Sequence, residues 1–156
     1  MSQKDKKFKY RLETVLKVRG IKEKKEQEEF AKKQRAYLEE KRKEEQIDNE
    51  KKAKSGELRT ILKKGPISDF ERVMRRRSHL GVLKDQLDTQ IEEVKKAQEK
   101  VDKQRENLID AMKNRKIIEK DKEHKFKSYD KEMKKLEGDF LDEIATVRHE
   151  YLKRQD

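Results

Sequence analysis

Three histidines and many carboxylates are the side chains of this sequence that could bind a metal or move protons. His79, His124 and His149 lie far apart along the chain, and His149–Glu150 lacks the second histidine that a zinc-binding helix motif requires. There is no glycine-rich phosphate loop, and the absence of cysteine excludes disulfides and thiolate metal sites. We therefore predict a protein that is not an enzyme and that binds no metal or cofactor.

The composition is that of long exposed helices. Charged residues make up 51% of the 156 residues and hydrophobic residues 30%, whereas an ordinary globular domain is about half apolar and a quarter charged. Such a chain cannot bury a conventional core. The 45 basic and 34 acidic residues nearly balance, and the apolar residues are periodic, which favours helices over disorder. Since no apolar run approaches the ~18 residues of a membrane span, we expect an intracellular protein, soluble or at most peripheral.

A single turn divides the chain. Pro66, the only proline, follows Gly65, and proline cannot continue a helix. Ser68 and Glu71 then form a potential capping box, in which Ser68 would cap the start of the next helix. We predict helix one over about residues 8–64, a turn at 65–68 and helix two over about 69–153. The predicted fold is all-α, one coiled-coil domain over residues 1–156: a long antiparallel two-helix hairpin with unequal arms.

Helix two carries a coiled-coil heptad pattern over about five heptads. The a positions are Val73, Leu80, Leu87, Val94, Val101 and Leu108, and four d positions are Leu83, Ala97, Ala111 and Ile118. Arg115 and Lys122 occupy the next a positions, and the apolar phase restarts at Phe126 after a stutter. No glycine or proline lies near the stutter, so we expect one continuous helix.

Helix one is apolar only at its two ends, around residues 8–19 and 58–62. In one interpretation, the stems of Lys and Glu side chains cover the apolar seam of helix two. In the other, the seam is partly open and awaits another helix. Ser55–Gly56 could also end helix one early.

The position of the turn sets the pairing of the two helices. Position i of helix one should lie opposite about position 133 − i of helix two, so Phe8 should lie near Lys125. Residues from Phe126 onward would then extend ~40 Å beyond helix one at 1.5 Å per residue. This overhang would hold Phe126, Tyr129, Phe140 and Tyr151, four of the nine aromatics. An apolar stripe on an isolated helix predicts a partner; fraying or self-association is the alternative.

Basic charge is concentrated in two segments. Residues 1–25 carry ten basic and three acidic residues, and residues 63–77 carry six and two, which together account for the formal charge of +11. Such patches attract acidic proteins, nucleic acid or anionic lipid. The arrangement matches neither a basic zipper nor a single-strand binder with interleaved aromatics. Nucleic acid is therefore the least favoured partner.

Two short motifs lie near the ends of the sequence. Phe8–Arg19 reads FKYRLETVLKVR, and Leu141–Arg148 reads LDEIATVR. Together with the chain length, the central turn and the basic charge, these motifs resemble the FliJ family of flagellar export proteins. The resemblance covers the whole chain in architecture but only these two stretches in motif.

The resemblance implies a coiled-coil stalk, similar to the central stalk subunit of rotary ATPases, that acts in flagellum biogenesis and motility. Its paired termini would sit in the hexameric flagellar export ATPase, and it would link the ATPase to the membrane export gate and escort export chaperones. Its location would be cytoplasmic, peripheral at the cytoplasmic face of the bacterial cell membrane. On this hypothesis the ATPase-binding residues are Phe8, Tyr10, Leu12, Leu16, Arg19, Phe140, Ile144 and Arg148. The gate-binding residues are Phe70, Met74, Arg75, Arg76 and Arg77. Intramolecular packing is the alternative role for all of them.

Two other functions remain open. A coiled-coil tether or homodimeric scaffold would have no ATPase partner. A basic nucleic-acid clamp would bind DNA with a steep dependence on salt.

Overall fold

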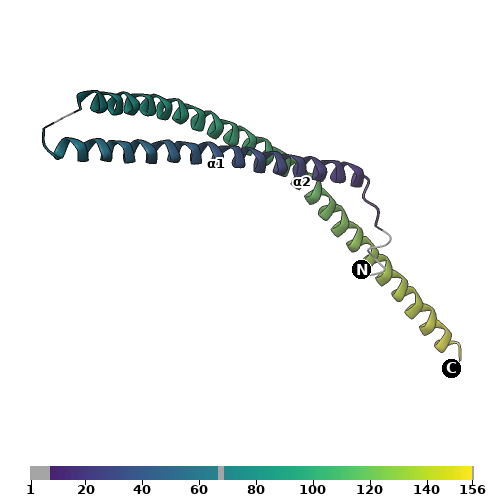
Figure 1. The fold of residues 1–156 in the computed structure, drawn as a ribbon. Coiled ribbons are helices and arrows are strands. Elements are labelled where there is room, and N and C mark those ends of the chain that lie inside the picture. The colour runs from purple at the N-terminus through teal and green to yellow at the C-terminus, as the bar shows by residue number, and fades with distance from the viewer. Residues whose placement is uncertain (1–7, 67–68, 156) are drawn as a thin grey trace. The chain divides into compact units, whose positions relative to one another are not determined.

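The structure is a computed structural model that describes residues 8–66 and 69–155. These residues form two helices, α1 (Glu13–Lys63) and α2 (Phe70–Lys153), and no strand occurs among them. The helices pack against each other in opposite directions, with α1 coloured from purple to teal and α2 from teal through green to yellow (Figure 1). The predicted all-α hairpin is confirmed, and its arms are unequal, with 51 residues in α1 and 84 in α2.

The inter-residue contacts fall into two units. One unit is Lys24–Asp110, which contains the turn, and the other combines Met1–Glu23 with Ala111–Asp156. The single domain expected over residues 1–156 stays a prediction.

The turn lies close to its predicted place. α1 ends at Lys63. Gly65 has a φ of 113°, a backbone conformation that residues with a Cβ atom rarely adopt. Asp69 caps α2, because its Oδ1 accepts a hydrogen bond from the backbone N–H of Arg72 at 3.1 Å. Ser68, the residue predicted as the cap, lies outside the described residues. The cap that the structure shows is therefore Asp69.

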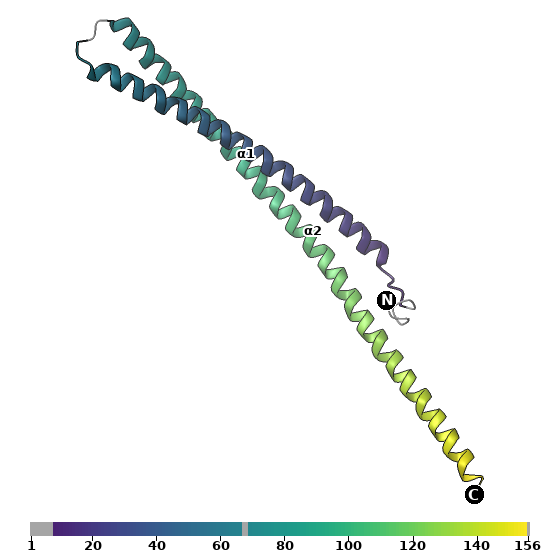
Figure 2. The same ribbon diagram turned by 60° about the horizontal axis from the view of Figure 1, so that its bottom comes forward.

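Within the Lys24–Asp110 unit, α1 and α2 lie side by side (Figure 2). The heptad seam of α2 faces α1, and Leu83, Val94 and Val101 are its buried apolar residues there, with Leu83 only 2% exposed. Glu57 pairs with Arg76 at 2.7 Å, at the spacing that the turn predicts. The predicted register is therefore confirmed in this unit.

Three polar residues occupy d positions that the apolar pattern skipped. Arg76, Gln90 and Gln104 lie fourteen residues apart, and each reaches a glutamate of α1. The Gln90 amide donates to the Glu40 side chain at 2.6 Å and to its backbone carbonyl at 2.9 Å. The hydrogen bond from Gln90 lowers the pKa of Glu40, against the opposing effect of burial. Such polar layers specify register at a cost in stability.

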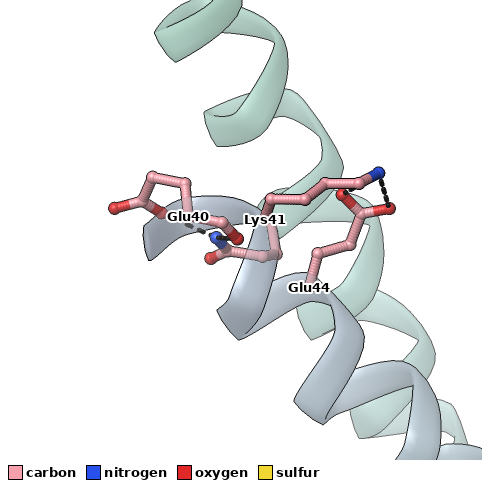
Figure 3. Close-up of polar contacts among 4 residues, drawn as sticks. Glu40, Lys41 and Glu44 are labelled. Atoms are coloured by element: carbon pink, nitrogen blue, oxygen red, sulfur yellow. Dashed lines mark hydrogen bonds and ion pairs between the residues drawn. The ribbon is translucent and has the colours of Figure 1, made fainter. Parts of the chain in front are cut away.

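The facing seam of α1 mixes charged and apolar residues. One row of half-buried positions in this unit recurs every three or four residues: Glu26, Phe30, Lys33, Tyr37, Glu40, Glu44, Ile47, Lys51, Lys54, Leu58 and Ile61. Lys41, beside this row, pairs along the helix with Glu44 at 3.3 Å (Figure 3). Long charged side chains therefore line part of the seam beside apolar ones, and both interpretations of the seam stay predictions. Gly56 does not end α1; its carbonyl accepts a hydrogen bond from the Thr60 hydroxyl at 2.9 Å.

Candidate partner-binding surfaces

The first surface belongs to the unit of residues 8–23 and 111–155, whose N-terminal segment packs on α2. α1 begins at Glu13, not at residue 8 as predicted, and residues 8–10 are non-helical. Phe8 and Tyr10 both contact α2. In a helix, residues two apart lie on different faces, so the two side chains could not both reach α2 in this way.

Phe8 and Tyr10 form a clasp on α2. The Phe8 ring lies 5.3 Å from Phe126 in an edge-to-face arrangement and 5.4 Å from Tyr129. Tyr10 is 8% exposed, and its hydroxyl donates to Asp121 Oδ2 at 2.5 Å. Burial, followed by this hydrogen bond, raises the pKa of Tyr10 to about 12.

This pKa predicts a loss of the clasp at alkaline pH. The folded state keeps Tyr10 protonated up to about pH 12, whereas the ordinary tyrosine pKa is 10.0. The contribution of the Tyr10 hydroxyl to stability is therefore fully present below pH 10 and is lost as the pH rises through 12. The measurement is the difference in tyrosinate absorbance at 295 nm between wild type and Tyr10→Phe. We expect a titration midpoint near 12. A midpoint near 10 would contradict the clasp, and Tyr37→Phe is the control.

Ion pairs add to the packing around the buried apolar residues Ala111 and Ile118. Lys122 pairs with Glu13 at 2.8 Å, and Arg115 pairs with Glu23, which raises the pKa of Arg115. The two basic a positions are thus matched by glutamates of α1. α2 is continuous through the stutter, as predicted.

The first five predicted ATPase-binding residues are engaged within the chain. Phe8 and Tyr10 form the clasp, Leu12 and Leu16 are half-buried, and Arg19 donates to the Asn114 carbonyl at 2.8 Å. The roles of these five residues in partner binding stay a prediction. The expected overhang of α2 begins later than predicted, because Phe126 and Tyr129 contact Phe8.

The C-terminal segment of α2 carries an exposed apolar stripe. Every residue from 134 to 155 is exposed, including Phe140 at 63%, Ile144 at 47% and Val147 at 61%. The stripe forms one open groove lined by Phe140, Glu143, Ile144, Val147, Arg148 and Tyr151. The structure thus brings the three predicted residues Phe140, Ile144 and Arg148 together. Glu143, Val147 and Tyr151 were missed as site residues, although they lie at the same helical spacing of three and four.

The second surface lies at the turn, in the Lys24–Asp110 unit. Phe70 is 67% exposed and Met74 47% exposed, and Arg75 and Arg77 are also exposed. Arg76 is held by Glu57, so it differs from its two neighbours.

The sequence profile of the flagellar FliJ protein matches residues 8–152. The chain belongs to the flagellar FliJ family. As a FliJ-family member it is a component of a type III protein export apparatus. No curated protein sequence is significantly similar to the chain.

A solved structure shares the fold of this FliJ-family chain. It is described as a putative YscO homolog, CT670, from Chlamydia trachomatis, with a TM-score of 0.53 and 21% sequence identity. The match covers 96% of this chain and 99% of that one. In the part of the chain that the structure describes, no helix is long and apolar enough to cross a membrane.

Proposed function

We propose that this FliJ-family protein is a non-enzymatic stalk that inserts its terminal unit into the hexameric flagellar export ATPase. The observation that carries the proposal is the exposed stripe around Phe140, Ile144 and Val147. An isolated apolar helix face of this kind favours burial against another protein. Arg148 and Glu143 border the groove and would set the orientation of the stalk in the pore.

The clasp supports the same role. The Phe8–Phe126 and Tyr10–Asp121 contacts fix the start of the chain on α2. A helix anchored in this way can transmit force between its exposed end and the paired helices, and the mechanism would be mechanical and electrostatic. We propose that Phe8, Tyr10, Leu12, Leu16 and Arg19 act mainly by holding this anchor.

The turn is the proposed contact with the membrane export gate. Phe70, Met74, Arg75 and Arg77 are exposed there and would meet an acidic surface of the cytoplasmic domain of the gate. Arg76 would contribute through its ion pair with Glu57. We further propose that the protein escorts export chaperones and works at the cytoplasmic face of the bacterial cell membrane.

Co-purification with two baits tests the proposal. The full chain should bind the hexameric export ATPase and stimulate its ATP hydrolysis, and it should separately bind the cytoplasmic domain of the gate. Sedimentation at several concentrations should show an elongated monomer. A concentration-dependent dimer that binds neither bait would instead support a tether or homodimeric scaffold.

A further inference from the structure

One flank of the hairpin beside the turn combines apolar and basic side chains. This flank belongs to the Lys24–Asp110 unit. In the heptad register, Arg59 and Leu62 of α1 and Phe70, Met74 and Arg77 of α2 occupy e and b positions. These positions border the same side of an antiparallel pair. Phe70, Met74 and Arg77 also follow the spacing of four and three that places residues on one helix face.

The ion pairs at the opposite border support this assignment. His79 and Glu50, both at g positions, lie 3.9 Å apart, and Glu57, also at g, reaches Arg76. The acidic side chains nearest the turn in α1 therefore lie on the other flank. The flank that holds Phe70 carries Arg59, Leu62, Phe70, Met74, Arg77, Gly81 and Lys84, none of them acidic.

The apolar members of this flank are exposed. Phe70 is 67%, Leu62 49% and Met74 47% exposed, and Arg59 and Arg77 beside them are exposed as well. None of the three apolar side chains lines the hollow at the turn, which is formed by Ile61, Lys64, Gly65, Pro66, Asp69, Arg72 and Val73. They project from the helix sides, and a projecting cluster fits a deformable surface better than a preformed pocket.

We propose that this flank binds the surface of an anionic lipid bilayer. Phe70, Met74 and Leu62 enter the boundary between headgroups and acyl chains, as the apolar face of an interfacial helix does. Arg59 and Arg77 bind the lipid phosphates, because guanidinium groups match phosphate oxygens in geometry and charge. The excess of six basic over two acidic residues in 63–77 attracts the same surface. The proposed gate contact uses Phe70, Met74 and Arg77 as well, so lipid and gate would compete for these side chains. Lipid binding itself needs neither the ATPase nor the gate.

Vesicle binding by the full chain tests the proposal. Since the protein has no tryptophan, Phe70→Trp introduces a single fluorophore on the flank. Its emission should shift to the blue with vesicles that contain about one third phosphatidylglycerol and should not shift with pure phosphatidylcholine. Val82→Trp, at an exposed c position on the other flank, is the control and should show no shift.

Two variants with the same change in charge distinguish binding by this flank from a general effect of net charge. Arg77→Glu and Arg75→Glu change the charge equally, but Arg75 occupies a c position on the opposite flank. Measured by co-sedimentation, Arg77→Glu should weaken the partition to anionic vesicles about tenfold and Arg75→Glu no more than about threefold. Equal losses, or no binding of wild type to anionic vesicles, would overturn the proposal. Gate binding that survives such a result would assign the flank to a protein partner instead.

Discussion

Removal of residues 140–156 is expected to abolish binding to the export ATPase and stimulation of its activity. The deleted segment contains the groove residues Phe140, Ile144 and Val147, which are 47–63% exposed, and every described residue of the segment is exposed. Circular dichroism should therefore show that the remaining chain is still helical. The measurement is ATP hydrolysis by the hexameric ATPase with increasing amounts of truncated or intact protein.

A pair of full-length variants sharpens this test. Ile144→Ser with Val147→Ser places hydroxyls in the groove, whereas Ala145→Ser with Thr146→Ser makes small changes on residues outside it. The first variant should lose stimulation and the second should retain it. Full stimulation by the truncated protein would show that the ATPase binds elsewhere, and the clasp would then be the next candidate.

Leu83→Ala is expected to destabilise the hairpin by about 2–4 kcal/mol. Leu83 is 2% exposed, and replacing a buried leucine removes transfer free energy and leaves a cavity. The effect should be large for this protein because much of the facing seam of α1 is Glu and Lys, so few other apolar contacts compensate. The measurement is urea unfolding followed by circular dichroism at 222 nm.

The neighbouring residue supplies the control. Val82 is 50% exposed, and Val82→Ala should change the free energy of unfolding by less than about 0.5 kcal/mol. Similar effects of the two substitutions would mean that the heptad seam is not the source of stability.

The candidate site was predictable in part. The apolar residues Phe140 and Ile144 follow from helical spacing, and they do line one groove with Arg148. Arg75, Arg76 and Arg77 look alike in sequence, yet it is Arg76 that lies at the seam and pairs with Glu57 at 2.7 Å. Which of three adjacent arginines is engaged depends on the partner helix, and the local pattern of charges does not contain that information.

The polar layers show the same limit. Gln90 and Gln104 interrupt the apolar d positions, and they donate hydrogen bonds to Glu40 and Glu26 across the seam, which the apolar pattern does not predict. A heptad pattern is recognised by its apolar residues. It does not reveal that a polar residue at a d position has a hydrogen-bond partner 50 or 78 positions away in the sequence.

The sequence by itself determined the two helices, the turn at Gly65–Pro66 and the register of their pairing. These features depend on local propensity and on counting outward from one turn. Only the tertiary structure decided that Phe8 and Tyr10 leave the helix to clasp α2. The reason is that packing two aromatic rings and satisfying the buried Tyr10 hydroxyl outweighs one more turn of helix, and those partners are more than 100 residues away.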